Sequence, residues 1–531
     1  MTKINKSKIF QTLLSILLVL LLMVGCTPTI SQDPDSTVEP TPTKGTQNDT
    51  SDTEEPMKIS IAMWELSEFG NDPVGESIEK ELNIDVEAIL LEWSDWSEKI
   101  KLWAASDELP DCIATTTVAD SKRFYSWVDE ELIREIPEDL IDKFPHTKIK
   151  MDNNSILNMT REVTGGTYYI PRPETMNNVW TANQTYMLYR KDWMENLGIS
   201  EMPEDMDSLY EVLKQFTVGD PDQNGVDDTY GLTGNYGTLY ACFNAHPFTW
   251  VEEDGNVIPG YLSNDMVDAL KWFRKLFSEG ILDPELKTDD AKFAQNTFGA
   301  YLKNLDAWWA QRTVVEIFGE ANKELGDPLE VVGIMGPFAE KAGSEKMWSP
   351  LIQTSGTEIS YNVSDEKLEK ILQLDNYLVS PEGNDLRYWG IKDIDYSVDA
   401  AGNYKKLNDD VLRTKYPSIF IQNWPTWDWE WNADESNSGN PDISIEVKQF
   451  SGEARERYNK AFNLDKTKIR LDAAYIFTPA REKFMFDYQT TLINIITGTD
   501  DVETMFDTMV SDAYAAGVQT VIDEANAYLN Q

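Results

Sequence analysis

Histidine and cysteine are scarce in this chain, whose 531 residues include two histidines and three cysteines. Two histidines, His146 and His246, cannot supply a multi-histidine metal centre, and three cysteines cannot build a disulfide framework. Cys112 and Cys242 lie in apolar stretches, which favours buried reduced thiols, with a disulfide between them as the alternative. A histidine-rich catalytic metal site and a disulfide-stapled fold are therefore excluded.

Basic residues are also few, because 46 Lys and Arg stand against 92 Asp and Glu, a formal net charge of -46. Nucleic acids and anionic membrane surfaces are bound by concentrated basic faces, so both classes of partner are excluded. The same charge disfavours acidic polymers as ligands unless a local arginine such as Arg312 compensates. Hydrophobic residues make up 41% of the chain, enough for large cores, and the length predicts two or three folded units.

The N-terminus carries the most specific local signal. Lys3, Lys6 and Lys8 precede the apolar run 16–24, which is short for a spanning helix and is followed by Gly25-Cys26. This resembles a bacterial lipoprotein signal, which implies cleavage after residue 25 and acylation (palmitate) of Cys26. An uncleaved anchor helix is the alternative. Either reading places the body on the extracellular face of the cytoplasmic membrane.

Residues 26–56 then form the lipidated cysteine and a tether. They are rich in proline, acidic residues, serine and threonine and contain almost no large apolar residue. This composition predicts a disordered segment, since it cannot bury enough apolar surface to offset chain entropy. The folded body is expected to begin near Met57 and to touch the membrane through the lipid anchor only.

A regular alternation of elements opens the body. Strands are predicted at Lys58–Trp64, Ile84–Leu91 and Asp111–Thr116, with helices at Gly75–Leu82 and Trp93–Ser106 between them. This β-α-β-α-β order favours a parallel sheet, whose carboxyl edge is where ligands bind in open α/β folds.

The downstream chain predicts a second α/β unit. A strand is expected at Tyr186–Arg190, and helices at Leu209–Phe216, Asp265–Glu279, Lys367–Tyr377 and Val502–Tyr528. The last of these helices is expected to break near Gly517, because glycine interrupts helices.

Five stretches carry a resemblance to a known family. Leu102–Asp111 (LWAASDELPD) is similar to the "LASGDLPD" element of sugar-binding lipoproteins, and Gly165–Pro171, Leu188–Gly198, Trp272–Asp283 and Leu374–Gly383 agree with the same group in the same order. The chain thus resembles extracellular solute-binding protein family 1, in particular the large oligosaccharide-binding lipoproteins of Gram-positive bacteria. The resemblance implies a two-lobed, periplasmic-binding-protein-like α/β fold of type II, with lobes joined by crossing strands and ligand held between them.

The expected lobes follow from that fold. Residues 57–181 and 351–399 are assigned to lobe 1, and 182–350 with 400–531 to lobe 2. The resemblance implies a monomer without catalytic residues that captures an oligosaccharide and delivers it to the permease of an ABC importer. A secreted, lipid-anchored glycosidase or polysaccharide lyase is the alternative, since acidic catalytic pairs have no universal local signature. A surface adhesin is the third hypothesis.

Tryptophan supplies the candidate sugar contacts, because an indole face packs well against the apolar face of a sugar. Trp427 and Trp429 alternate with acidic residues, which predicts either an extended aromatic platform or a strand over a core. Trp308 and Trp309 follow a segment that resembles the family element in which a strand delivers an aromatic side chain to the ligand. One of this adjacent pair is expected in the core, because neighbours in a strand face opposite ways. The remaining candidates beside predicted strand ends are Trp64, Asn183, Tyr236 and Trp348.

The segment Asp220-Pro-Asp-Gln-Asn-Gly-Val-Asp-Asp228 predicts a structural Ca²⁺ site. Its spacing resembles an EF-hand loop, with side-chain oxygens at positions one, three, five and nine and glycine at six. Asp220, Asp222, Asn224 and Asp228 would contribute side chains, and Val226 its carbonyl. Glycine stands where an EF-hand has its glutamate at position twelve. A solvated Asp/Asn/Gly turn is the alternative.

Overall fold

The structure is a computed structural model. It describes residues 55–92, 94–115, 121–172, 182, 185–286, 289–349, 355–424, 443–462, 466–474, 476 and 478–530. The chain divides into two units, 1–54 and 55–531, and everything below concerns the second. The signal segment, Cys26 and almost all of the tether lie outside the described residues.

The first sheet has five strands in the order β2-β1-β3-β11-β4. They are β1 (Met57–Trp64), β2 (Ile84–Leu91), β3 (Cys112–Thr115), β4 (Tyr169–Pro171) and β11 (Gly356–Ile359). β1 pairs in parallel with β2 and with β3, while β11 runs antiparallel between β3 and β4. The predicted parallel opening is confirmed, because the helices α2 (Pro73–Leu82) and α3 (Trp96–Ser106) return the chain to the same end of the sheet.

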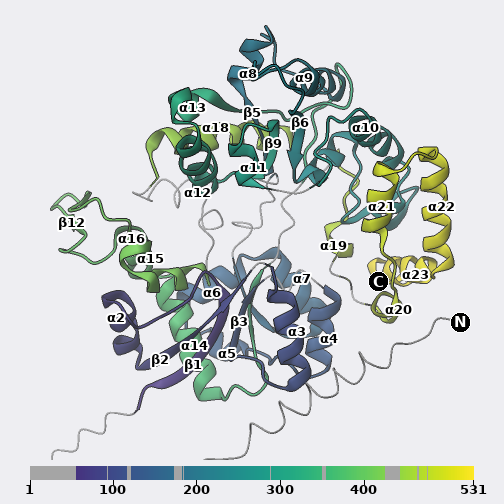
Figure 1. Cartoon of the computed structure of the whole chain (residues 1–531). Coiled ribbons are helices and arrows are strands. Elements are labelled where there is room, and N and C mark those ends of the chain that lie inside the picture. Colours follow the sequence, from purple (N-terminus) through teal and green to yellow (C-terminus); the bar gives the residue numbers. More distant parts are fainter. Residues whose placement is uncertain are drawn as a thin grey trace, which may run out of the picture. The chain divides into compact units, whose positions relative to one another are not determined.

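A buried ion pair connects two helices beside this sheet. α14 (Asp365–Leu378) packs against β1 and against α6 (Pro145–Asp152) (Figure 1). Asp375 on α14 accepts hydrogen bonds from Lys150 Nζ at 2.6 Å and from Thr147 Oγ1 at 2.5 Å. Both charged side chains have no exposed surface. Water therefore cannot reach either charged group unless the two helices move apart.

The second sheet has four strands in the order β10-β5-β9-β6. They are β5 (Thr185–Arg190), β6 (Tyr230–Gly234), β9 (Phe298–Asn304) and β10 (Val332–Met335). β9 pairs in parallel with β6 and antiparallel with β5, and β5 pairs antiparallel with β10. Phe216 of α9 (Met206–Val218) packs so closely on this sheet that a Cβ atom at Gly299 would lie 2.2 Å from its ring. Glycine is thus required at that strand position.

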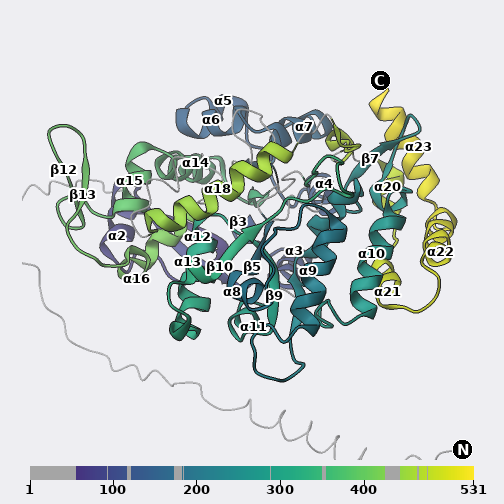
Figure 2. The same cartoon turned by 90° about the horizontal axis from the view of Figure 1, so that it is seen from above.

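Helices near the C-terminus contribute to the hydrophobic core beside the second sheet. α10 (Met266–Ser278) packs against α21 (Tyr488–Thr497) and α22 (Val502–Ala515), and α22 packs against α23 (Val518–Leu529) (Figure 2). The predicted break near Gly517 is confirmed, since Gly517 has φ 102° between α22 and α23. That angle lies in the left-handed region, which glycine adopts without a Cβ penalty.

The other named elements are shorter or lie outside the two sheets. Before β9 they are α4 (Ser121–Asp129), α5 (Glu138–Ile141), α7 (Ser155–Thr164), α8 (Lys191–Asn196), η3 (Tyr236–Phe243), β7 (Trp250–Glu253), β8 (Asn256–Pro259), η4 (Gly260–Leu262) and α11 (Asp290–Ala294). After β9 they are α12 (Ala307–Ala310), η5 (Gln311–Gly319), η6 (Lys323–Leu325), α13 (Pro328–Val331), α15 (Pro381–Trp389), β12 (Tyr396–Val398), β13 (Tyr404–Lys406), α16 (Leu412–Lys415), η7 (Pro417–Asn423), α18 (Ile445–Ala461), α19 (Leu471–Ala474) and α20 (Pro479–Lys483). In the described ranges, no helix combines the length and apolar character needed to cross a bilayer.

Two large hydrophobic cores follow the two sheets. The first draws its buried residues from 59–170, 359–378 and 412–424, and the second from 182–348 and 443–522. The expected boundary at residue 399 differs from this division, because Leu412, Tyr416 and Trp424 are buried in the first core. Their segment follows α15, which packs against α14, so the chain returns to the second core only after residue 424.

Replacing Asp375 with asparagine is expected to destabilise the protein strongly. The buried Lys150 ammonium would lose the Asp375 carboxylate, and breaking such a buried pair costs about 3–5 kcal/mol of unfolding free energy. Asp365, on the same helix, is a matched control because its carboxylate pairs with Arg134 while 92% exposed. Asp365→Asn should cost less than about 1 kcal/mol. Equal losses in urea denaturation would contradict the role given to the buried pair.

Candidate functional site

Strand direction places three loops at one edge of the second sheet. Because β6, β9 and β10 run the same way, their carboxyl ends at Gly234, Asn304 and Met335 share that edge. β5 runs the opposite way, so its first residue, Thr185, lies there too. Open α/β sheets bind ligands outside the carboxyl ends of their strands. This edge is therefore the candidate ligand-binding edge.

The first sheet has an equivalent edge, and the chain connects the two. β1, β2, β3 and β4 end there, and the antiparallel β11 begins there at Gly356. The chain leaves the end of β4 at Pro171 and enters the second sheet at Thr185, then returns from beyond β10 to Gly356. Both connections thus run between carboxyl edges, which is the topology of two lobes joined by crossing segments.

Trp308 and Trp309 follow β9 at the candidate edge, but they lie on the short helix α12 and not on a strand. Both indoles are partly exposed. The Arg413 guanidinium lies 4.5 Å from the ring centroid of Trp308, and Lys303 Nζ lies 4.5 Å from that of Trp309. Trp308 packs against the second core but stays partly exposed, so neither residue of the pair is fully buried. Consecutive helical residues diverge by about 100° and need not face opposite ways, as neighbours in a strand do.

Asp306 explains why the helix begins at that position. Its Oδ1 accepts a hydrogen bond from the backbone N–H of Trp309 at 2.9 Å, the arrangement of a helix N-cap. Its Oδ2 is buried and has no hydrogen-bond partner among the described residues. Burial raises the pKa of Asp306 to about 6, against the opposing effect of the two Trp backbone N–H groups and of Arg455 and Arg413. Burial thus disfavours the ionised form of Asp306, which lies at the candidate ligand-binding edge.

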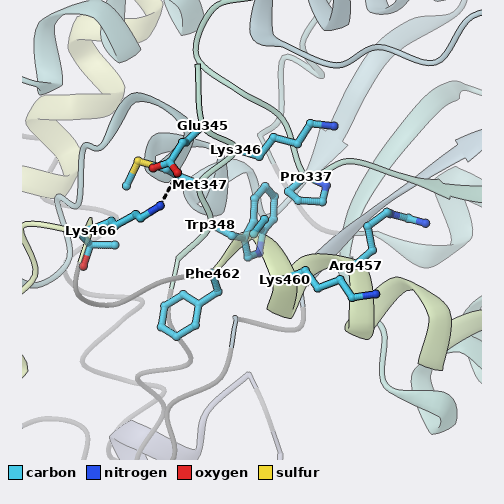
Figure 3. A pocket seen from close by; sticks show the side chains of 11 residues that line it. Pro337, Glu345, Lys346, Met347, Trp348, Arg457, Lys460, Phe462 and Lys466 are labelled. Carbon is cyan, nitrogen blue, oxygen red and sulfur yellow. Dashed lines mark hydrogen bonds and ion pairs between the residues drawn. The ribbon is translucent and has the colours of Figure 1, made fainter. Parts of the chain in front are cut away.

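A pocket of about 400 Å³ lies beyond the end of β10. It is lined by Pro337, Glu345, Lys346, Met347, Trp348, Arg457, Lys460, Ala461, Phe462, Lys466 and Thr467, and is called the basic pocket below. Figure 3 shows Trp348 near its centre and Phe462 below, with the Glu345–Lys466 ion pair on the side opposite Arg457 and Lys460. The loop after β10 and the helix α18 together supply most of the lining.

A second pocket, of about 350 Å³, lies beyond the end of β6. It is lined by Gly234, Asn235, Tyr236, Gly237, Tyr240, Phe248, Leu286, Gln489, Leu492, Ile493 and Ile496, and is called the neutral pocket because none of these residues is charged. Tyr236 packs at 5.3 Å, centroid to centroid, on Phe273, while Phe248 is exposed. Aromatic rings beside two side-chain amides are a set of groups that can hold uncharged sugar rings.

The other sequence-predicted site residues are buried or outside the described residues. Trp64 ends β1 at the edge of the first sheet but is 3% exposed and packs edge-on against Trp96 at 5.6 Å. Trp348 is fully buried and packs on Tyr458, with ring centroids 4.7 Å apart. It therefore lies under the more exposed side chains that line the basic pocket. Asn183, Trp427 and Trp429 lie outside the described residues.

Sequence reasoning missed the basic residues and the amides of the two pockets. Lys346 precedes Arg457 and Lys466 by more than a hundred residues, and Asn235 meets Gln489 only in the fold. Acidic residues are twice as numerous as basic ones, so the overall composition gives no sign of a local basic cluster. The one available signal was the spacing of Arg457 and Lys460, which are three residues apart and so share a helix face.

The 220–228 loop brings its oxygen-bearing side chains together through its own hydrogen bonds. The Asn224 amide donates to Asp222 Oδ2 at 2.8 Å and to Asp228 Oδ1 at 3.3 Å, and the Gly225 N–H donates to Asp220. Burial, together with the carboxylates of Asp228 and Asp220, raises the pKa of Asp222. In the part of the chain that is described, no three His, Cys, Asp or Glu side chains stand at metal-binding distances. In this arrangement Asp222 and Asp228 are held by the Asn224 amide, and Asp220 by the Gly225 N–H.

The two described cysteines and His246 take no part in a site. Cys112 and Cys242 are buried free thiols, as predicted, and burial raises the pKa of both, that of Cys242 to about 12. Burial lowers the pKa of His246 to about 3, so its imidazole is neutral at physiological pH. All three side chains serve as packing groups.

The sequence matches the model of the bacterial extracellular solute-binding protein family over residues 66–385, more than half of the chain. The chain belongs to this family. The solute-binding protein is 25% identical over 370 residues to lipoprotein LipO of Bacillus subtilis, an alignment that covers 66% of this chain and 70% of LipO. It is 26% identical to the polygalacturonan/rhamnogalacturonan-binding protein YtcQ of the same organism, over 43% of this chain and less than half (46%) of YtcQ.

Solved structures confirm the two-lobed α/β fold of this solute-binding protein. The fructooligosaccharide ABC transporter substrate-binding protein FusA of Streptococcus pneumoniae, in complex with kestose, is 20% identical with a TM-score of 0.66, covering 90% of this chain and 99% of FusA. An EF-hand mutant of FusA in complex with fructo-nystose gives a TM-score of 0.65 at 19% identity over the same shares of the two chains. Two of these relatives, YtcQ and FusA, are named as binding proteins, and the third, LipO, as a lipoprotein.

Asp306→Asn is expected to make the free energy of unfolding less dependent on pH. The pKa of Asp306 is raised from 3.8 to about 6, so the folded state binds its proton more tightly, and stability rises as pH falls from about 6 towards 4. Asparagine keeps the N-cap acceptor without the charge. At pH 7 the variant should be more stable by about 1–3 kcal/mol, and this difference should vanish near pH 4. Urea denaturation at both pH values tests this; a variant that is less stable at pH 7 would contradict it.

Proposed function

We propose that this solute-binding protein captures an oligosaccharide outside the cell and hands it intact to an ABC importer. One observation carries the proposal. In a chain of this family, partly exposed aromatic rings and two pockets gather beyond the strands that end at the candidate edge. The permease and its ATPase are separate chains, and this chain contributes binding only.

Physical chemistry favours a sugar at such an edge. The apolar C–H face of a pyranose or furanose ring packs on an indole or phenol, while the hydroxyls bond to amides and water at the rim. Trp308, Tyr236 and Phe248 offer the rings, and Asn235 and Gln489 the amides. FusA and YtcQ, which bind oligosaccharides or polysaccharides by their names, support this ligand class.

The membrane attachment belongs to the same proposal. The signal-like segment 1–25, Cys26 and the tether 26–56 would hold a monomer at the outer face of the cytoplasmic membrane through acyl chains. The relative LipO is a lipoprotein, which supports this arrangement. Palmitate labelling of the chain should be lost in Cys26→Ser.

The binding activity is tested by calorimetry against a panel of oligosaccharides, with recovery of the ligand afterwards. Trp308→Ala should weaken the affinity about tenfold, since a buried ring–sugar contact is worth more than 1 kcal/mol. Trp389→Ala is the matched control, because Trp389 is also a partly exposed helical indole but packs on Tyr404 at 5.0 Å, away from the second sheet. Ligand returned cleaved would favour the glycosidase or lyase, and no binding of any glycan would contradict the proposal.

We further propose that the 220–228 loop binds a structural Ca²⁺. Asp220, Asp222, Asn224 and Asp228 would present side-chain oxygens and Val226 its carbonyl, which is the hard-oxygen set that Ca²⁺ prefers. Burial raises the pKa of Asp222 first, and the nearby carboxylates of Asp228 and Asp220 add to it; the ion would relieve the repulsion among these carboxylates. FusA, for which an EF-hand mutant has been solved, supports this proposal. The ion would hold the loop between α9 and β6 and would play no part in ligand chemistry.

Removing Ca²⁺ should lower the melting temperature by several degrees, because binding to the folded state alone stabilises it. Asp222→Asn should abolish most of this shift, whereas Asp227→Asn, at a loop position with no assigned ligand role, should retain it. Elemental analysis of the dialysed protein gives an independent readout. A melting temperature that is unchanged by chelator, together with no bound calcium, would leave the loop as a simple turn.

A further inference from the structure

The basic pocket reverses the charge balance of the chain. Acidic residues outnumber basic ones by 92 to 46 overall, yet four of the five charged residues that line this pocket are Lys or Arg. The four are Lys346, Arg457, Lys460 and Lys466, and the single acid is Glu345. We propose that this pocket binds the carboxylate of an acidic sugar, so that the captured oligosaccharide contains uronic acid residues. This inference rests on the proposed function and names its ligand class.

Arg457 is the fixed cation of the pocket. Its Nε donates to the Gly336 carbonyl at 2.6 Å and its Nη2 to the Ile334 carbonyl at 2.8 Å. Carbonyl groups orient the guanidinium without neutralising it, and among the described residues Nη1 has no hydrogen bond. An oriented guanidinium with a remaining N–H group is suited to binding a carboxylate. Arg457 thus offers a preorganised positive charge beside the end of β10.

Each of the three lysines pairs with a glutamate that a ligand carboxylate can displace. Lys346 bonds to Glu204 at 2.8 Å and Lys460 to Glu456 at 2.6 Å, and Lys466 pairs with Glu345. The glutamate side chains are 65–76% exposed, so these pairs contribute roughly 0–1 kcal/mol each. Glu204 and Glu456 do not line the pocket. A ligand carboxylate can therefore take their place at low cost.

The volume and the lining of the pocket also fit a sugar acid. The volume of about 400 Å³ lies within the roughly 300–1,000 Å³ of ligand pockets. Phe462, which is partly exposed, and Met347 give the lining an apolar side on which a sugar ring can lie. The neutral pocket at the other end of the same sheet edge has no charged residue among its lining, so it suits the hydroxyl-bearing parts of a longer chain.

The local charge of the basic pocket is opposite to the net charge of the chain. A charge of -46 repels a polyanion over long range, and Arg312, considered as the compensating residue, is exposed on η5 and does not line the pocket. Long-range repulsion acts mainly on the association rate and is screened beyond about 8–10 Å at physiological salt. The local cations act at contact distance, where they decide which ligand stays bound.

The test compares ligands that differ only in charge. Trigalacturonate and its fully methyl-esterified form have the same rings and linkages, and calorimetry on the full chain measures both. We expect the acid to bind at least about tenfold more tightly than the ester. The double variant Lys346→Gln/Lys466→Gln should lose about three- to tenfold in affinity for the acid and little for the ester. Lys323→Gln is the control, since Lys323 pairs with Glu320 while both are 69% exposed, outside the pocket.

The outcomes separate this inference from the proposed function. Binding of the ester, or of neutral fructooligosaccharides, at least as tight as that of trigalacturonate would overturn the acidic-sugar inference and leave oligosaccharide capture standing. Tight binding of the acid that the double variant does not weaken would overturn the assignment to this pocket. Failure of every glycan to bind would overturn both proposals together.

Discussion

The direction of three strands is the constraint on which the candidate site depends. Because β6, β9 and β10 point the same way, the loops that follow them emerge at a single edge, and the side chains of residues 235, 308 and 348 come from that edge. A reversal of one strand would move its loop to the opposite end of the sheet, about 15 Å away for a strand of five residues. Pocket lining, aromatic rings and crossing segments all follow from this shared direction.

The first half of the fold could be predicted well from the sequence. β2 runs over Ile84–Leu91 as predicted, and β1 and α10 agree within one residue at each end, because their apolar periodicity is strong and their ends carry capping or glycine signals. The position of β11 could not be predicted, since its four residues pair with strands that lie far away in the sequence. The return of residues 412–424 to the first core was missed for the same reason: the packing partner of a short helix is set by tertiary contacts.

The candidate site was predicted in part. Aromatic residues near strand ends are visible in a sequence, and the predicted Tyr236, Trp308 and Trp309 are partly exposed beyond such ends. Burial is not visible in a sequence, and Trp64 and Trp348 are covered. Clusters of charged residues are even harder to predict from a sequence. The lining of the basic pocket draws on the loop after β10, on α18 and on Lys466, and each segment taken alone is unremarkable in charge. Only the fold shows that these residues line one pocket.

The strand β11 has a consequence for how the molecule is made. In the first sheet Ile359 pairs with Cys112, a partner synthesised almost half the chain earlier, and β4 touches the sheet only through β11. A nascent chain that has reached residue 335 therefore has every strand of the second sheet and only three adjoining strands of the first. Closing so long a loop slows folding and leaves sheet edges open meanwhile, so the polypeptide needs protection from aggregation until β11, about two thirds of the way along the chain, has emerged.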